Sequence, residues 1–298
     1  MSSNASNAPN VKGTAAARAL PILAVLTGAL LGGSSGLYIK GLAFSSLAMS
    51  SLRMTVPFLL VLPAVARHGL LLGKPGMRRR LFLASALNAG RMLLFMFAYK
   101  LTAIGNAVVL LYLWPVFALV IDSVRLRRPL GAAKLGILLL AMGGVVVMNL
   151  HKDFSLVGTD LVGSLCMIAS ALIFAVTAII FKQALSVISE ADTLYFQNAV
   201  GAFIYLPFLI AEIPRAPLSH LGLGVVYGVL VGLVGFGLFF VGMKRLPLFQ
   251  YSALSYCEVP CGLLMGILFL GERMTMNQAI GMALIVAGSL LAQRLRAT

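Results

Sequence analysis

Two groups of polar and aromatic residues lie inside long apolar stretches of this sequence, and each group has the spacing of one helix face. The first group is Asn88, Arg91, Phe95 and Tyr99. The second group is Tyr251, Ser255, Glu258 and Gly262. Residues three or four positions apart are neighbours on the surface of an α-helix. Because guanidinium groups bind carboxylates and carboxylates bind ammonium groups, the two faces together could hold a small molecule that carries both charges.

The composition explains why such residues are unusual here. Of the 298 residues, 60% are hydrophobic and 10% are charged, whereas soluble domains have about 25% charged residues. Apolar segments of about 20 residues, long enough to cross a lipid bilayer, recur along the whole chain. An ionisable side chain at the centre of such a helix costs about 2.5–3.5 kcal/mol on insertion scales, so it faces the bundle interior or a water-filled cavity.

The hydrophobic pattern predicts an all-α integral membrane protein with ten transmembrane helices. Their predicted ranges are 20–40, 47–67, 80–101, 105–124, 132–150, 159–183, 191–211, 221–243, 248–270 and 274–293. Residues 1–19 are small and polar, and predict a disordered cytoplasmic tail. The rest of the chain is predicted to form two five-helix repeats, residues 20–152 and 153–298.

The net charge of +15 follows the predicted topology and does not indicate a nucleic-acid partner. Most of the 23 lysines and arginines lie at helix ends that face the cytoplasm when the N-terminus is inside. Cytoplasmic loops of membrane proteins carry such an excess of basic residues. The pattern therefore predicts that both termini are cytoplasmic, and that the partner of this charge is the lipid bilayer.

Internal repetition supports the division into halves. When Pro115 is aligned with Pro260, several other residue pairs coincide: Leu101 with Leu246, Arg128 with Arg273, Gly136 with Gly281, and Gly143 with Gly288. An odd number of helices per half forces the second half to cross in the opposite direction, so the repeat is predicted to be inverted. Inverted repeats are typical of secondary transporters, whose substrates bind near mid-membrane between the halves.

The matched residues also predict local structure. Proline removes one backbone hydrogen bond from a helix, so Pro115 and Pro260 are predicted hinges. The matched glycines predict a close approach of the fifth and tenth helices.

Three stretches carry a resemblance to known proteins. They are "SLRMT" in the second helix, "NAVVLLYLWPVFALVID" in the fourth, and "FLGERMTMNQAIGMALIVAGSLL" at the end. These resemble the drug/metabolite transporter superfamily, specifically its EamA-type ten-helix exporters, and "YLWP" further resembles the YddG-type exporters of aromatic amino acids. The resemblance implies a multi-pass protein of the bacterial inner (plasma) membrane. It also implies export of amino acids, with aromatic or hydrophobic ones favoured, from the cytoplasm by alternating access.

We assign substrate binding to the polar and aromatic residues predicted near mid-membrane. They are Asn88, Arg91, Phe95, Tyr99, Tyr112, Trp114, Tyr251, Ser255, Tyr256 and Glu258. Arg91 is expected to bind a carboxylate, Glu258 an ammonium group, and the aromatic rings an apolar side chain. Glu258 is also the candidate for proton coupling. In the alternative interpretation, Arg91 and Glu258 pair with each other and fix the register of the halves, and the aromatic rings only pack.

Two other charged residues are expected to have structural roles. Arg53 is predicted to extend to the lipid headgroups, and Asp122 is predicted to pair with Arg125. Arg91 is then the only deep basic residue, which disfavours an exchanger of anionic nucleotide sugars. Two further functions stay open: a multidrug or other metabolite exporter of the same superfamily, and a non-transporting membrane scaffold or lipid-handling protein.

No catalytic residue, metal site or cofactor is predicted. His68, His151 and His220 fall in predicted loops far apart in the sequence, which disfavours a zinc site. The three cysteines lie inside predicted helices, so no disulfide framework is indicated. Because no phosphate-binding or metalloprotease motif is present, transport is expected to use a gradient.

Overall fold

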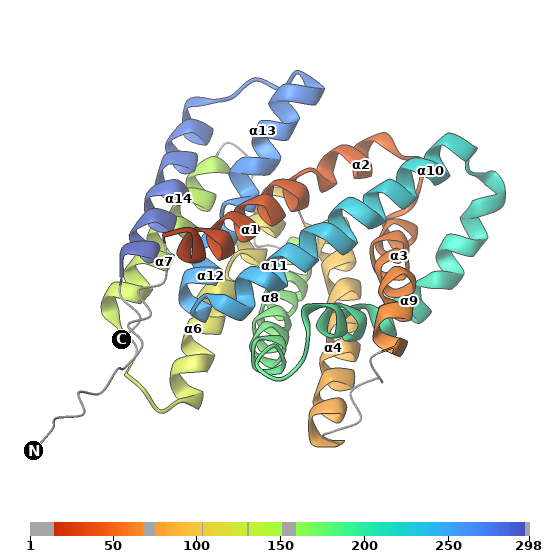
Figure 1. The fold of residues 1–298 in the computed structure, drawn as a ribbon. Helices are drawn as coiled ribbons and strands as arrows, with labels where there is room; N and C mark the ends of the chain where they lie inside the picture. The colour runs from red at the N-terminus through yellow and green to blue at the C-terminus, as the bar shows by residue number, and fades with distance from the viewer. Residues whose placement is uncertain (1–14, 68–74, 103, 130, 151–158, 296–298) are drawn as a thin grey trace, which may run out of the picture.

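Figure 1 shows the computed structural model of the chain. The structure describes residues 15–67, 75–102, 104–129, 131–150 and 159–295, and within these ranges it contains helices and turns but no strand. The first-half helices are α1 (Ala15–Gly33), α2 (Ser35–Gly41), α3 (Ser46–Arg67), α4 (Pro75–Leu101), α5 (Ile104–Leu111), α6 (Trp114–Arg125) and α7 (Ala132–Met148). The all-α prediction is confirmed.

The second half contains matching elements and two irregular segments. Its helices are α8 (Thr159–Ala184), α9 (Glu190–Glu212), the 3-10 turn η1 (Ile213–Arg215), α10 (Leu218–Tyr227), the π-helical segment η2 (Gly228–Gly235), α11 (Phe236–Arg245), α12 (Leu248–Ser255), α13 (Glu258–Leu270) and α14 (Met276–Arg294). Nine segments of the described chain are long and apolar enough to cross a membrane, and α7 is a shorter apolar helix. Together they form the ten predicted spans.

Spans 1, 4, 8 and 9 each consist of consecutive helical pieces: α1–α2, α5–α6, α10–η2–α11 and α12–α13. The first helix begins at Ala15, so residues 15–19 of the predicted tail are helical. Residues 1–14 lie outside the described part of the chain, as does the predicted boundary between the halves at residues 152 and 153.

The helix contacts repeat when the two halves are exchanged. Corresponding spans meet directly, because α3 packs against α9 and α7 packs against α14. The remaining contacts occur in matched pairs. The first-half helix α4 packs against α8, and the second-half helix α11 packs against α1. The two pieces of span 4, α5 and α6, pack against α8, and the corresponding pieces of span 9, α12 and α13, pack against α1. With five crossings in each half, this pattern gives two inverted five-helix repeats, as the sequence predicted.

Spans 4 and 9 are broken at matching positions, each just before a predicted hinge proline. Pro115 follows the break between α5 and α6, and Pro260 follows the break between α12 and α13. Proline has no N–H, so Pro115 and Pro260 each remove one hydrogen bond from the regular ladder next to the break. Proline alone does not end a helix here, because α3 and α9 continue through prolines. At the breaks, Leu113 N–H donates to the Leu110 carbonyl at 3.3 Å and Cys257 N–H donates to the Leu254 carbonyl at 3.0 Å, the tighter pattern of a 3-10 turn.

The two breaks lie against each other at the centre of the bundle. The Tyr256 hydroxyl donates to the Tyr112 carbonyl at 2.9 Å, and the two rings are stacked with their centres 5.8 Å apart. Both side chains are buried. This contact joins the first half to the second at the depth where each span loses its regular helix.

Spans 5 and 10 pack closely, as predicted, but the first-half glycine at the contact is Gly144. A Cβ on Gly144 would lie 2.5 Å from the Gly281 carbonyl oxygen, whereas a Cβ on Gly136 or Gly143 would meet no atom within 4 Å. The prediction that Gly136 and Gly143 form this contact is therefore wrong. Neighbouring residues point about 100° apart around a helix, so a shift of one residue selects a different face.

The bundle has one end rich in basic residues, which we call the basic end. Spans 2, 4 and 10 finish there at Arg67, Arg125 and Arg294. At this end α6 packs against α12, and Lys244 pairs with Glu190 at 3.0 Å. At the opposite end, the halves are linked by other contacts: α13 packs against α1 and α2, and Lys40 pairs with Glu272 at 2.8 Å.

Candidate functional site

Glu258 lies inside the bundle, at the first position of α13 and directly after the break in span 9. A Cβ on Gly32 of α1 would lie 2.6 Å from its Oε1 atom, so the absence of a side chain at Gly32 leaves room for the carboxylate. The Tyr112 side chain, at the break in span 4, is near enough to interact with the Glu258 carboxylate. The carboxylate therefore lies where spans 1, 4 and 9 meet, at the favourable N-terminal end of a helix.

Arg91 is buried, with 6% of its surface exposed. Its guanidinium carbon lies 4.6 Å from the centre of the Phe174 ring on α8, a cation–π contact. Its Nε donates to the Asn88 Oδ1 atom at 3.3 Å, and the Asn88 amide donates to the Gln197 carbonyl of α9 at 3.2 Å. Asn88 thus fixes the orientation of Arg91 relative to the second half.

Arg53 also points into the bundle, so the prediction that it extends to lipid headgroups is wrong. Its guanidinium carbon lies 5.3 Å from the centre of the Phe236 ring, and one terminal nitrogen lies 3.3 Å from the Met92 sulfur. Its Nε atom is buried and has no hydrogen-bond partner among the described residues. The face of α3 that carries Arg53 is covered by η2, where Gly232 lies directly against the Arg53 carbonyl.

Arg53, Arg91 and Glu258 are near enough to interact electrostatically. They do not form ion pairs: among the described residues, nitrogen–oxygen approaches within 4.0 Å occur only between Lys40 and Glu272 and between Lys244 and Glu190. The alternative in which Arg91 pairs directly with Glu258 is therefore not what the structure contains. Two cations from the first half and one anion from the second half share the centre without neutralising each other by contact.

Aromatic rings border these charges. The Trp114 ring centre lies 4.7 Å from that of Phe174 and 6.3 Å from that of Tyr251. Along α4, the rings of Phe95 and Tyr99 lie 4.6 Å apart. Because Phe174 contacts both Arg91 and Trp114, the predicted aromatic residues of spans 4 and 9 are connected to the arginine on span 3.

Two predicted residues hold the backbone in place. The Ser255 hydroxyl donates to the Ser252 carbonyl at 2.7 Å, and the Tyr256 hydroxyl donates across the halves to the Tyr112 carbonyl. Both side chains are buried, at 3% and 0% exposure. Contact between these residues and a substrate remains a prediction.

Three residues of this site were not among those predicted: Arg53, Phe174 and Phe236. An ionisable residue inside an apolar span is itself an indication of a functional site, and that indication was present for Arg53. The phenylalanines gave none, because the chain has 17 of them and any apolar helix accepts them. Only the packing of α8 and α11 shows that Phe174 and Phe236 are the two phenylalanines that lie against arginines of the centre.

The other sequence-predicted groups can also be located. The predicted Asp122–Arg125 ion pair is absent from the described residues, and Asp122 instead interacts electrostatically with Lys182 of α8. No group of three or more His, Cys, Asp or Glu side chains in the described ranges is placed to hold a metal ion. His68 and His151 lie outside those ranges. His220 lies in α10, so its predicted loop position is wrong, and it accepts a hydrogen bond from Ala43 N–H at 3.0 Å.

A bundle of apolar spans built from inverted repeats, with charged side chains at its centre, is the architecture that secondary transporters use. The comparison with known families agrees: residues 19–150 and 161–293 match the EamA-like transporter family, one stretch for each half. The chain belongs to this family, which is part of the drug/metabolite transporter superfamily.

Individual proteins and structures are also similar to the chain. An uncharacterized transporter of Archaeoglobus fulgidus is 27% identical over 272 residues, covering 91% of this chain and 95% of the relative. Solute carrier family 35 member G1 of Mus musculus is 23% identical over 245 residues, covering 77% and 65% respectively. A crystal structure that is 20% identical covers 93% of this chain and 99% of its own, with a TM-score of 0.75, which supports the fold.

Proposed function

We propose that this transporter exports amino acids, with aromatic and hydrophobic ones favoured, by alternating access around the central site. The observation that carries the proposal is the placement of Arg53, Arg91 and Glu258 at the meeting point of the halves, within electrostatic range but outside ion-pair distance. Charges held apart in this way suit a ligand that carries both signs itself. The resemblance of "YLWP" to aromatic amino acid exporters points to the same cargo.

Each part of a zwitterionic amino acid has a suitable partner in this arrangement. The two guanidinium groups are donors for the carboxylate, and the buried Nε of Arg53 still lacks an acceptor among the described residues. The Glu258 carboxylate is the acceptor for the ammonium group. Trp114 and Phe174 offer rings for an aromatic or aliphatic side chain. The preference for amino acids over purely cationic drugs rests on the two arginines.

Alternating access is supported by the symmetry of the breaks. Both hinge prolines lie beside the central contact between Tyr112 and Tyr256, so spans 4 and 9 can bend at the same depth. In this structure α6 packs against α12 at the basic end. Bending at the breaks would separate these two helices, and the matched geometry of the halves gives the second state a similar energy.

The proposal includes the bacterial inner membrane as location, with both termini and the basic end in the cytoplasm. It rests on the excess of lysine and arginine at the basic end. Labelling of single cysteines in inside-out and right-side-out vesicles tests the orientation. A cysteine at Arg125 should react with an impermeant reagent only in inside-out vesicles, and a cysteine at Arg215 only in right-side-out vesicles. The reverse pattern would contradict this part of the proposal.

One observation favours a second candidate within the same superfamily. With Arg53 included, the centre has two arginines, whereas the sequence indicated only Arg91 as a deep basic residue. Two guanidinium groups also suit a metabolite with a carboxylate and no ammonium group. A metabolite exporter of this type would not need Glu258 for recognition, so this residue separates the two candidates.

Counterflow in proteoliposomes tests the proposal. The purified full-length chain is loaded with unlabelled tryptophan, and uptake of labelled Trp, Phe, Tyr and Leu is measured against a nucleotide sugar and a quaternary ammonium drug. Phenylalanine methyl ester and 3-phenylpropionate are added as competitors, because they lack the carboxylate and the ammonium group respectively. We expect both to compete at least about tenfold more weakly than phenylalanine.

Other outcomes have definite meanings. Equal competition by 3-phenylpropionate would replace the amino acid with a simple organic acid as cargo. Flux confined to the nucleotide sugar or the drug would contradict the proposed substrate class. If Arg53→Gln, Arg91→Gln and Glu258→Gln leave all solute fluxes unchanged, the central site is not a transport site and a scaffold role is favoured.

A further inference from the structure

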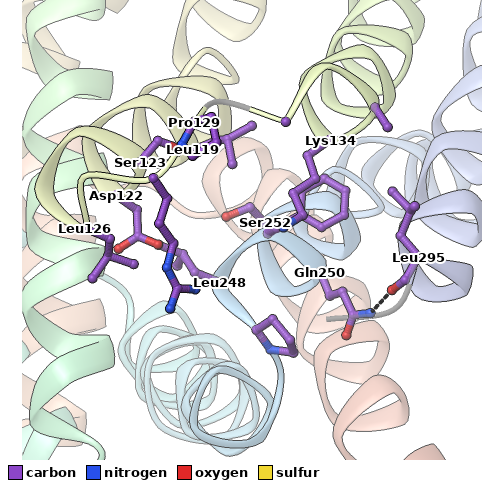
Figure 2. A pocket seen from close by; sticks show the side chains of 15 residues that line it. Leu119, Asp122, Ser123, Leu126, Pro129, Lys134, Leu248, Gln250, Ser252 and Leu295 are labelled. Atoms are coloured by element: carbon purple, nitrogen blue, oxygen red, sulfur yellow. Dashed lines mark hydrogen bonds between the residues drawn. The ribbon is translucent and has the colours of Figure 1, made fainter. Parts of the chain in front are cut away.

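A cavity of about 950 Å³ lies at the basic end, away from the central site. None of the residues proposed as substrate partners at the central site lines it. It lies between the halves, because α6, the following turn and the first turn of α7 form one wall, and the start of α12 and the end of α14 form the other (Figure 2). Much of its lining is apolar, including Leu126, Leu248, Phe249 and Leu295. The cavity therefore lies at the level of the membrane where spans 4 and 10 end and span 5 begins.

Two basic side chains line the cavity without a partner in an ion pair. Neither Arg128 nor Lys134 approaches a carboxylate within 4.0 Å among the described residues. Asp122 also lines the cavity, but it interacts electrostatically with Lys182 on α8, outside the cavity. The lining therefore has an excess of positive charge, which suits a ligand with a single negative charge.

The backbone turn that places Arg128 is unusual. α6 ends in a Schellman motif, in which Arg128 N–H donates to the Ser123 carbonyl at 3.0 Å and Arg127 N–H donates to the Val124 carbonyl at 3.1 Å. The left-handed position of this motif is normally glycine, but here it is Arg127, with φ of 50°. The turn brings Arg128 and Pro129 back over the cavity.

The first turn of α7 offers backbone donors to the same space. Leu135 N–H makes the first helical bond, to the Gly131 carbonyl at 3.0 Å, so the N–H groups just before it have no helical acceptor. The N-cap Gly131 gives no side-chain cap, whereas α9 and α14 begin with capping boxes. The Lys134 stem lies against Gly131, since a Cβ there would be 3.6 Å from its Cδ atom. A helix N-terminus with an adjacent ammonium group favours anions.

A buried hydroxyl supplies independent evidence for a polar ligand. Ser252 lines the cavity and is 1% exposed, yet its Oγ atom has no hydrogen-bond partner among the described residues. Buried hydroxyl groups in folded proteins are normally satisfied. An acceptor that enters the cavity would give Ser252 the partner it lacks.

We propose that this cavity binds the phosphodiester headgroup of an anionic phospholipid. Arg128, Lys134, the start of α7 and the Ser252 hydroxyl donate to the phosphate oxygens, and the apolar wall contacts the glycerol and the first methylenes of the acyl chains. Basic pockets between spans at the membrane surface bind such headgroups. The apolar wall and the position at the span ends favour a lipid over free phosphate, and the excess positive charge favours an anionic headgroup over a zwitterionic one.

The test measures lipid retention. The full-length protein is reconstituted in nanodiscs of phosphatidylcholine with graded amounts of phosphatidylglycerol, extracted, and examined by native mass spectrometry for bound lipid. We expect retention of phosphatidylglycerol over phosphatidylcholine, and a fall in this preference of about tenfold in the Arg128→Gln/Lys134→Gln double variant. Ser252→Ala should lower the preference by about threefold, the effect of a lost neutral hydrogen bond.

Arg127→Gly is the matched control, because it removes one positive charge from the same turn, does not line the cavity, and suits the left-handed backbone. It should keep the wild-type preference. An unchanged preference in the double variant, or an equal loss in Arg127→Gly, would overturn the proposal. Equal retention of phosphatidylethanolamine, or displacement of the lipid by millimolar inorganic phosphate, would overturn the assignment to an anionic lipid.

The variants can be checked for folding without lipid. Arg128 is exposed and Lys134 is half-buried, so the unfolding temperature in lipid-free detergent should not change. If the double variant is unstable, Lys134→Gln and Ser252→Ala are tested singly in the same retention assay. Wild-type preference in both single variants would then overturn the proposal.

Discussion

The two halves have the same arrangement of helices but contribute different chemistry to the centre. The first half supplies both arginines, from α3 and α4, while the second half supplies the acid and the two rings against which the arginines lie. At the matching breaks, α6 begins with Trp114 and α13 begins with Glu258. The duplication thus provides a symmetric helical frame, and the divergence of a few side chains makes the centre of that frame chemically asymmetric.

A second difference concerns regularity. Span 3 is one continuous α-helix, whereas its counterpart, span 8, contains the π-helical segment η2. Segments of this type are common at functional sites, because the extra residue redirects the side chains that follow. Here the segment packs against α3 and is followed directly by Phe236, the ring beneath Arg53. The π-helical segment of the second half thus precedes the ring that lies against Arg53 of the first half.

The largest expected effect comes from removing Glu258, the one acid that the described residues place at the centre. Glu258→Gln removes the proposed acceptor for the substrate ammonium group, and loss of one charged partner at a binding site commonly costs about 2 kcal/mol or more, so amino acid counterflow should fall by about 30-fold or more. The same assay with and without a pH gradient tests proton coupling. The matched control is Glu272→Gln, which breaks an exposed ion pair and should change flux by less than about fivefold. Equal effects of the two changes would contradict the division of roles.

The next effect concerns the first-half arginine that the sequence misplaced. Arg53→Gln should weaken apparent substrate affinity by about tenfold, from the concentration dependence of counterflow. The apparent substrate affinity of Arg53→Lys should lie between those of the wild type and Arg53→Gln, because lysine keeps the charge and loses the planar donor group. Arg215→Gln, an exposed arginine at the opposite end, is the control. An unaltered affinity in Arg53→Gln would return this residue to a purely structural role.

A smaller effect on counterflow is expected from a substitution at Gly32, which lies against the Glu258 carboxylate. Gly32→Ala places a Cβ against the carboxylate and should slow counterflow by about threefold to tenfold, since added atoms in a packed site displace their neighbours. Gly36→Ala is the control on the same span, because a Cβ there meets no atom within 4 Å. If both variants transport equally well, the position of the carboxylate is not limiting.

The smallest expected effect concerns the stability of the left-handed residues that follow α6 and α13, at the ends of spans 4 and 9. α6 is followed by Arg127 with φ of 50°, and α13 is followed by Gly271 with φ of 66°. Arg127→Gly should raise the free energy of unfolding by about 1 kcal/mol and Gly271→Ala should lower it by about 1 kcal/mol, because left-handed backbone is costly for residues with a Cβ. Unfolding in a mixed detergent series measures both. Changes of the opposite sign would contradict this account.

Much of the fold could be predicted from the sequence, because the responsible forces are local. The length of each apolar stretch determines the ten crossings, and an odd number of crossings per half inverts the second half. The matched prolines Pro115 and Pro260 indicated that spans 4 and 9 deviate from a regular helix at equivalent depths. The inward position of Glu258 and Arg91 followed from the cost of a charge in lipid. Each of these inferences concerns one residue or one helix and the surrounding solvent.

Only the tertiary structure decided which face of each helix points inward. A span that is apolar on all sides has weak amphipathic periodicity, so its rotation is set by neighbouring helices rather than by its own sequence. For this reason the sequence misplaced Arg53, chose Gly143 where Gly144 makes the contact, and gave no indication of Phe174 or Phe236. The sequence by itself determined the number of spans and the hinge positions in spans 4 and 9, because these depend on the apolar length and the prolines of single helices. The packing of one half on the other determined which charges and rings share the centre, because it sets the rotation of each helix.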